Sequence, residues 1–205
     1  GTAFRAPDAT DRFGFGGNPL LQPEESTQIE LSLQQRLSGR QTLRLNAFQN
    51  DVDQLIEYVI TDFTTFDGEL RNTDQARIRG LELAWSMQGT DWQVRAEASH
   101  QKPKNRATGE VLLRRAQNSI ALGYVQGFGP VELGIDVLGV DERNDFGGAR
   151  LDAYALANVT ARYAMSADWS VLARVENVFN KQYELASGYN TPDRGLFVAV
   201  RFAPK

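Results

Sequence analysis

The stretch WSVLARVENVFNKQYELASGYNTPDRGLFVAVRF, which runs from Trp169 to Phe202, decides the fold class of this chain. It predicts a strand from Trp169 to Val178, a polar loop up to Arg194, and a final strand from Gly195 to Phe202. In the final strand every even-numbered residue is apolar, whereas the odd-numbered residues include Arg201. This alternation has the period of two that is typical of a β-strand whose two faces meet different surroundings.

The same alternation recurs along the rest of the chain and predicts an all-β architecture. It indicates about nine complete strands, and residues 1–7 read as the end of another one. No segment requires a helix. At about 3.3 Å per residue, the strands are long enough to cross a hydrocarbon core when they are tilted. The predicted strands cover residues 24–37, 43–58, 78–87, 92–99, 120–124, 131–137, 151–163, 169–178 and 195–202.

Short and long connections alternate between these strands. The short ones lie near residues 38, 88, 127 and 166, and the long ones near 8–23, 61–75, 101–112, 141–150 and 181–193. Transmembrane barrels show this asymmetry, with short periplasmic turns and longer extracellular loops. Large aromatic residues lie beside the short turns or the chain end, where such barrels carry an aromatic girdle; they are Trp85, Trp92, Tyr124, Tyr163, Trp169 and Phe202. The sequence therefore favours an antiparallel transmembrane β-barrel fragment.

The composition excludes several other classes. The formal net charge is -4 and the isoelectric point is near 5.1, so no basic stripe is available for nucleic acid. The chain has no cysteine and one histidine, His100, which argues against a disulfide framework and against a metal cluster. No run of about 18 apolar residues exists, so the sequence predicts no transmembrane helix.

Two alternatives stay open on the pattern alone. A soluble β-sandwich binding module also has alternating strands, with the apolar face turned inward, and periodicity does not say which face is inside. An outer-membrane enzyme such as a phospholipase would need a Ser/His pair, for which only His100 is available. Loop asymmetry and the aromatic residues at strand ends favour the membrane barrel, and no catalytic cluster is evident.

The C-terminal stretch resembles the C-terminal signature of TonB-dependent outer-membrane receptors. Further segments extend the resemblance to nearly the whole chain and look most like the cobalamin branch of this family; they are residues 1–7, 14–19, 21–24, 50–52, 55–58, 76–82 and 112–116. One departure is that residues 203–205 follow the final aromatic residue, whereas the family usually ends on it. The signature consists of Asn177, Phe179, Asn180, Lys181, Tyr183, Gly188, Tyr189, Arg194 and Gly195, followed by a strand that ends in Phe202.

The resemblance implies a barrel of about 22 strands that is closed by an N-terminal plug. Residues 1–205 would be the C-terminal portion of that barrel, without the plug, the TonB box and the first half of the wall. The implied function is uptake of cobalamin across the Gram-negative outer membrane, with a siderophore or other metal-chelate receptor as the alternative. The implied partners are the ligand, the TonB complex through the missing plug, outer-membrane lipid, and the barrel assembly machinery through the C-terminal strand. No cofactor is implied.

Two long loops are candidates for ligand contact. If the short turns face the periplasm, the loops at residues 141–150 and 181–194 open to the outside. They offer aromatic surface with amide and guanidinium donors, which suit a corrin ring edged with amides. Ordinary loop polarity is the competing explanation, because these residue types populate many exposed loops. The candidate ligand-binding residues are Arg143, Asn144, Tyr183, Tyr189 and Asn190.

The strand pattern also makes two structural predictions. Arg162, Arg174, Glu176 and Arg201 fall on polar faces and are expected to line the lumen, where charges of both signs can pair across strands. About nine or ten strands cut from a larger barrel leave two unpaired edges, so we expect a curved, open sheet whose first and last strands do not pair.

Overall fold

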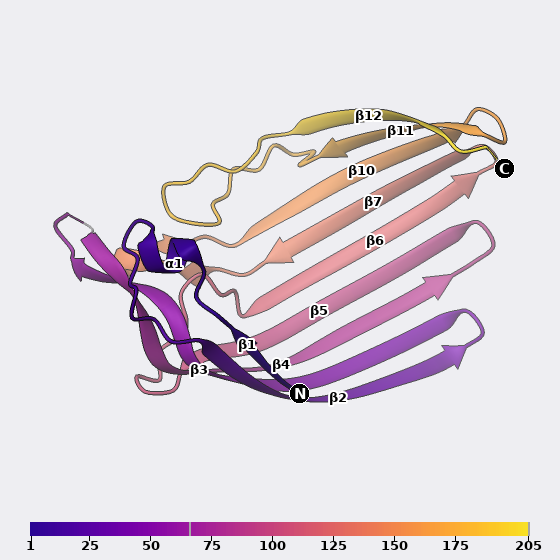
Figure 1. Cartoon of the computed structure of the whole chain (residues 1–205). Coiled ribbons are helices and arrows are strands. Elements are labelled where there is room, and N and C mark those ends of the chain that lie inside the picture. Colours follow the sequence, from indigo (N-terminus) through magenta and orange to yellow (C-terminus); the bar gives the residue numbers. More distant parts are fainter. Residues whose placement is uncertain (66, 205) are drawn as a thin grey trace.

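The chain forms one curved, antiparallel sheet of ten strands in the computed structural model, which describes residues 1–65 and 67–204, without the side chains of residues 73 and 74 (Figure 1). Each strand pairs with its neighbour in sequence. The strands of the sheet are β1 (Thr2–Arg5), β2 (Glu24–Ser38), β3 (Gln41–Asp62), β4 (Asp67–Gln88), β5 (Trp92–Asn105), β6 (Asn118–Phe128), β7 (Val131–Val140), β10 (Tyr154–Ala164), β11 (Trp169–Glu176) and β12 (Gly195–Phe202).

Three small elements and one short helix lie among the loops. The helix α1 (Ala9–Phe13) follows β1, and a second sheet pairs β8 (Arg143–Asn144) with β9 (Arg150–Leu151) around the 3-10 turn η1 (Phe146–Gly148). The long loops, α1 and these small elements gather at one end of the sheet, and the short turns lie at the other end (Figure 1). In the described part of the chain no helix is both long and apolar enough to cross a membrane.

The sheet is open, as predicted. In the strand order β1 and β12 are the two outer members, and within the described residues no ladder joins β12 to β1 or β2. Beyond its four pairs with β1, the strand β2 has a partner on one side only, as has β12. Each of these free edges presents unpaired backbone groups, which a membrane interior cannot hydrogen-bond.

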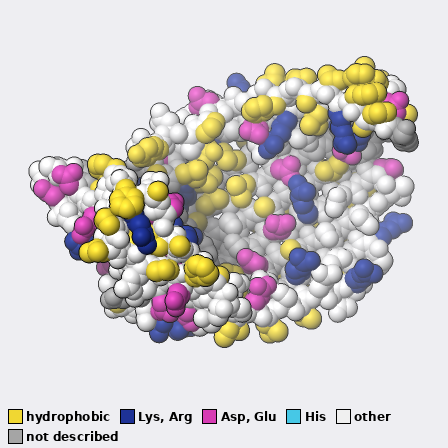
Figure 2. Space-filling model, viewed as in Figure 1, with side chains coloured by type: hydrophobic (Ala, Val, Ile, Leu, Met, Phe, Trp, Pro, Cys, Tyr) yellow, Lys and Arg dark blue, Asp and Glu magenta, His cyan; other side chains and the backbone are white. Residues whose placement is uncertain are grey.

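The pairing register assigns one face of every strand to the inside of the curve. Arg44 pairs with Ala84 and Ala84 with Glu97, and this row continues through residues that line a hollow on the concave face. The opposite face is apolar and exposed; Leu31 and Val198, for example, are 74% and 64% exposed. Figure 2 shows charged side chains on the concave face and hydrophobic side chains along the outer rims.

This distribution excludes the soluble sandwich. A sandwich buries its apolar faces between two sheets, whereas here the large sheet leaves its apolar face uncovered and the polar face lines the hollow. The buried apolar residues of the described chain are few and lie near the long-loop end or the strand ends beside it; they include Leu21, Ile56, Ala76, Pro103, Leu112, Leu151 and Ala157.

The aromatic residues predicted to form a girdle share the outer face near the short turns. The register pairs Trp85 with Ala96 and Tyr124 with Val94, which puts them on the apolar side of the sheet. Trp169 pairs with Phe202, and their ring centroids lie 4.7 Å apart. Amphipathic rings at this level suit the boundary between hydrocarbon and water.

Four sequence-based predictions about the elements were wrong. The expectation that the chain has no helix fails at α1, where Asp8 and Asp11 each accept a hydrogen bond from the other's backbone N–H. Most of the predicted loop at 61–75 is strand, because β3 and β4 continue as a long hairpin. Residues 101–105 continue β5, and the predicted strand 151–163 begins only at Tyr154.

The long hairpin has a physical reason. At about 3.3 Å per residue, β3 and β4 are each more than twice as long as a hydrocarbon core of about 30 Å is thick, so their far halves stand outside the membrane. Outside the membrane neither face needs to be apolar, and residues 61–75 therefore lack the alternation that marks the rest of the sheet. The backbone ladder from Leu55 to Ile60 against Gly68 to Thr73 carries the pairing there. Side-chain hydrogen bonds add to it, from Asn72 Nδ2 to the carbonyl of Gln54 at 2.7 Å and from Thr61 Oγ1 to the carbonyl of Asp67 at 3.2 Å.

Candidate functional site

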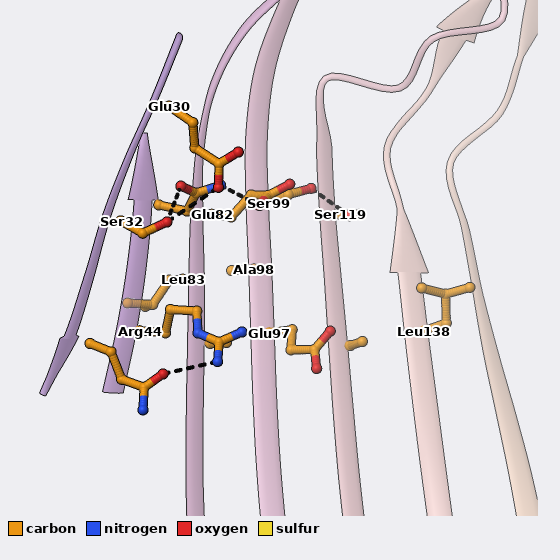
Figure 3. Close-up of a pocket in the computed structure, with 14 residues that line it drawn as sticks. Glu30, Ser32, Arg44, Glu82, Leu83, Glu97, Ala98, Ser99, Ser119 and Leu138 are labelled. Atoms are coloured by element: carbon orange, nitrogen blue, oxygen red, sulfur yellow. Dashed lines mark hydrogen bonds between the residues drawn. The ribbon is translucent and has the colours of Figure 1, made fainter. Parts of the chain in front are cut away.

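The concave face carries a polar hollow of about 810 Å³ over β2 to β7 (Figure 3). Ser32 Oγ lies 2.9 Å from Asn46 Oδ1 and 3.2 Å from Glu30 Oε1, and Asn46 Nδ2 donates to Glu82 Oε2 at 3.1 Å. Arg44 donates to Gln34 Oε1 at 2.9 Å. No described cation forms an ion pair with the carboxylates of Glu30, Glu82 or Glu97. The wall thus presents free negative charge toward whatever fills the lumen.

Further positive charges of the lumen lie on the later strands. The register confirms the predicted placement of Arg162, Arg174, Glu176 and Arg201, since all four occupy the same face as the hollow. Arg174 pairs with Glu176 at 3.1 Å, and Arg95 bridges to Asp136 on β7 at 2.5 Å. The first pair lies within β11, and the second reaches across β6 from β5 to β7, so both hold long side chains against the wall.

At the long-loop end, the segment after α1 packs on the β3–β4 hairpin. Leu70 N–H donates to the carbonyl of Gly16 at 2.7 Å, and Asn18 Nδ2 donates to the carbonyl of Leu70 at 3.1 Å. The Tyr58 ring stacks on Phe15 with centroids 6.3 Å apart and meets the edge of Phe146 at 6.4 Å. This aromatic row connects the first loop to the loop after β7.

Asp145 joins three loops through one carboxylate. Its side chain is 1% exposed; Oδ1 accepts from Arg114 Nε at 2.6 Å and from Phe146 N–H at 2.8 Å, and Oδ2 accepts from Ser187 N–H at 2.6 Å. Burial alone would raise the pKa of Asp145, but the hydrogen bonds from Arg114, Ser187 and Phe146 and the charge of Arg114 hold it below its ordinary value. The loops at residues 106–117, 141–153 and 177–194 therefore form one connected surface.

Arg143 and Tyr183 lie together beside this junction. Arg143 is 7% exposed, its Nη2 donates to the carbonyl of Glu184 at 2.7 Å, and its guanidinium lies 5.4 Å from the ring centroid of Tyr154. The rings of Tyr154 and Tyr183 are 4.5 Å apart. Arg143 Nη1 is buried and has no hydrogen-bond partner among the residues that the structure describes. This cluster packs the loop after β7 against the loop after β11.

The other three predicted residues are placed differently. Asn144 is exposed, and its carbonyl accepts from Arg114 N–H at 2.8 Å. Tyr189 is 71% exposed on the loop between β11 and β12, and Asn190 is exposed next to it and forms a backbone bridge with Glu184. The structure thus brings Arg143 and Tyr183 into one packed cluster and leaves Tyr189 and Asn190 facing solvent.

The C-terminal signature has a local structural cause. Asn177 is buried with φ of 49°, its Oδ1 accepts from Lys181 N–H at 2.8 Å, and its Nδ2 donates to the Lys181 carbonyl at 3.0 Å. Its own N–H donates to Asn158 Oδ1 at 2.9 Å. Asn180 Oδ1 then accepts from Arg194 N–H at 2.9 Å and draws the two ends of the loop together. Asparagine suits both positions because it tolerates positive φ and carries donor and acceptor.

Sequence reasoning missed the structural role of Arg114, Asp145 and Tyr154, which hold the predicted residues in place. Asp145 was hidden because a lone aspartate in a Gly-rich loop reads as solvated. Its three partners lie 31, 1 and 42 residues away, so only the tertiary structure identifies them. In the described residues no group of three or more His, Asp or Glu side chains is arranged to hold a metal ion.

The fold and the site define a class of protein: a segment of an outer-membrane β-barrel wall with short turns at one end and an ordered loop surface at the other. A family model described as "TonB dependent receptor-like, beta-barrel" matches residues 1–178, so the chain belongs to the TonB-dependent receptor family. The members of this family are transporters and not enzymes, as the sequence predicted.

Three known proteins illustrate the similarity. The vitamin B12 transporter BtuB of Photobacterium profundum is 28% identical over 210 residues, which cover 98% of this chain and 34% of that protein. The copper transporter OprC has a TM-score of 0.82 at 20% identity, over 98% of this chain and 37% of that chain. A variant of the ferric enterobactin receptor PfeA of Pseudomonas aeruginosa, in complex with enterobactin, has a TM-score of 0.76 at 19% identity. The match covers 98% of this chain and 37% of that chain.

The chain spans about a third of the length of the curated relatives it matches. At 20% and 19% identity, the two structural likenesses show the fold alone.

Proposed function

We propose that residues 1–205 are the C-terminal portion of the barrel of an outer-membrane receptor that takes up a cobalamin-type ligand with energy from the TonB complex. The observation that carries the ligand class is the similarity to a vitamin B12 transporter along nearly the whole chain. In this proposal the plug and the first half of the barrel belong to other parts of the receptor, and the free edges at β2 and β12 pair with them.

The loop surface supports a binding role. Asp145 and Arg143 are buried and hold neighbouring loops, so they are positioning residues in this proposal. Tyr189 and Asn190 are the groups that a ligand would meet, because both are exposed on the loop that Asp145 ties down. A flat aromatic ring beside an amide can contact a corrin edge and hydrogen-bond its amide side chains.

The lumen wall supports a plug as partner. Glu30, Glu82 and Glu97 present carboxylates that no described cation pairs with, so a domain with positive or donor groups on its surface would complement this side of the wall. The β12 strand, with its apolar outer face and free edge, is the element that the barrel assembly machinery would engage in this proposal.

The test is equilibrium binding of cyanocobalamin to the complete receptor in detergent. Tyr189→Ala and Asn190→Ala are expected to weaken binding by about tenfold each, a typical cost for one ligand-contacting side chain. Leu185→Ala is the matched control, because Leu185 lies in the same loop and is 54% exposed. Unchanged affinity in both variants would remove this loop from the ligand site.

A metal-chelate receptor is the second candidate. The observation that favours it is the fold likeness to a copper transporter and to a ferric enterobactin receptor. The same binding assay with ferric enterobactin and with Cu²⁺ distinguishes the two. Saturable binding of either one, together with no binding of cyanocobalamin, would replace the cobalamin proposal and keep the receptor class.

A further inference from the structure

A basic hollow of about 290 Å³ lies at the short-turn end of the lumen wall, on the same face as the polar hollow of Figure 3. It lies between the turn that joins β2 to β3 and the adjacent ends of β4 and β5. Arg36 pairs with Thr42 and Thr42 with Ser86, two residues along each strand from the row of Arg44 and Ala84. Since side chains alternate with a period of two, this row faces the lumen as the row of Arg44 does.

The side chains that line this hollow are mostly hydrogen-bond donors, and no Asp or Glu of the described chain is among them. Arg36 and Arg40 are exposed, and within the residues that the structure describes neither forms an ion pair. The carboxylate of Asp91, in the neighbouring turn, does not line the hollow. We call this hollow the mouth pocket; its main donor side chains are Arg36, Arg40, Thr42, Ser86, Gln88 and Gln93.

The free charge on the lumen wall changes sign along the strands. Glu82 and Glu97 line the polar hollow, and no described cation pairs with either. In the next lumen row toward the short turns, Arg95 is neutralised by Asp136, which leaves Arg36 as the free charge of that row on β2 to β7. Lys and Arg side chains on the concave face also lie toward the short-turn end in Figure 2. The wall is thus acidic near its middle and basic at the mouth pocket.

The position of the mouth pocket selects among anionic partners. A lipid headgroup is on the wrong side, because the membrane covers the apolar outer face and the pocket opens on the concave face. Since the chain spans about a third of the length of the curated relatives it matches, most of a receptor of that length lies outside residues 1–205. In the proposed function that remainder includes the plug, which fills the lumen beside this wall. The receptor's own chain therefore supplies the segment that reaches the pocket.

The donor set of the mouth pocket suits a carboxylate. The guanidinium groups of Arg36 and Arg40 can each donate two parallel N–H groups to the two oxygens of a carboxylate. The hydroxyl groups of Thr42 and Ser86 offer further donors in the same pocket. Because no carboxylate of the described chain occupies these donors, they are available to a second segment.

We propose that the mouth pocket binds Asp or Glu side chains of the plug at the periplasmic end of the lumen. This inference rests on the proposed function, in which a plug fills the barrel. The polar hollow and the mouth pocket carry opposite charges at two heights of one wall. Together they accept the plug in one axial orientation, with donor groups facing Glu82 and Glu97 and carboxylates facing Arg36 and Arg40. An inverted plug would place like charges together, which is unfavourable.

The test identifies the partner by zero-length cross-linking in the complete receptor in detergent. Arg36→Lys/Arg40→Lys keeps both charges and supplies amines, which a carbodiimide joins to a carboxylate in direct contact. Peptide mass spectrometry is expected to show cross-links from positions 36 and 40 to Asp or Glu of the plug. Lys102 and Lys104 are internal controls that should form none, because the register places them on the outer face. Absence of plug cross-links at positions 36 and 40, or cross-links only to residues of this chain such as Asp91, would overturn the proposal.

Charge reversal then measures what the contact contributes. Arg36→Glu/Arg40→Glu should accelerate hydrogen exchange at least about tenfold in the cross-linked plug segment and leave β6 and β7 unchanged. The lysine variant is the matched control and should keep slow exchange. Replacing the cross-linked carboxylate with Arg in the reversed variant should restore slow exchange, because the pairs form again with opposite sign. Equal exchange in the reversed variant and the unchanged receptor would count against the mouth pocket.

Cyanocobalamin binding separates this inference from the proposed function. Cross-links without cyanocobalamin binding would reject the ligand and keep the mouth pocket as the plug contact. Cyanocobalamin binding without cross-links would reject the mouth pocket alone.

Discussion

The wall and the loop end of this molecule are held together by different interactions. Along β6, β7 and β10 the strands pair in unbroken register, side chains alternate between lumen and lipid, and few residues are buried. At the loop end the backbone is irregular, and single buried side chains such as Asp145 and Arg143 join segments that are distant in sequence. The wall tolerates variation as long as the pattern is kept, whereas the loop end depends on individual hydrogen bonds.

The largest expected effect tests the wall. In the complete receptor, Leu31→Arg should destabilise the folded barrel by about 2 to 4 kcal/mol, because it puts a charge on the lipid face. Ser32→Arg should cost much less, because Ser32 faces the lumen beside the carboxylate of Glu30. Folding yield in lipid vesicles measures both, and equal yields would reverse the assignment of the two faces.

The next effect tests the loop end. Asp145→Ala should destabilise the loop surface by about 2 to 3 kcal/mol, because it leaves two backbone N–H groups and the half-exposed Arg114 without their acceptor. Hydrogen exchange should accelerate at residues 112–116 and 183–188 and stay unchanged in β6 and β7. If exchange in the wall rose equally, the two regions would form one cooperative unit.

Asn177→Ala should cost on the order of 1 kcal/mol, because it removes the side-chain hydrogen bonds to Lys181 and puts alanine at a positive φ. Lys181→Ala is the control, because only the backbone of Lys181 takes part in this turn. Thermal unfolding of the purified receptor measures the difference. Equal melting temperatures in the two variants would mean that the turn contributes nothing to stability.

The smallest effect is a pH dependence confined to the loops. The folded state lowers the pKa of Asp145 below its ordinary value of 3.8. The ionised carboxylate therefore stabilises the loop surface fully above that pH. The contribution is lost as the pH falls through the lowered pKa. Hydrogen exchange at residues 183–188 should therefore show acid sensitivity in the unchanged receptor, after correction for intrinsic rates, and none in Asp145→Asn. Persistence of the sensitivity in that variant would assign it to another group.

Sequence patterns predicted the wall well because its physics is local. The alternation of residues 195–202 follows from a membrane on one side and a lumen on the other, and the same rule located the strands around residues 120–137. The rule failed where the membrane ends, in the far half of the β3–β4 hairpin, because polar residues on both faces look like a loop. A capping pattern at Asp8 and Asp11 was present in the sequence and could have identified α1.

The sequence by itself determined which residues share a face of each strand and that large aromatic residues lie beside the short turns, because both follow from local order along the chain. The tertiary structure decided that the apolar face is the outer one. The sequence's candidate ligand-binding residues, chosen by residue type, were Arg143, Asn144, Tyr183, Tyr189 and Asn190. Only the tertiary structure decided that Arg143 and Tyr183 are packed while Tyr189 and Asn190 face solvent. That division depends on Asp145 and Tyr154, which meet their partners across tens of residues, and contacts of this range leave no periodic trace in a sequence.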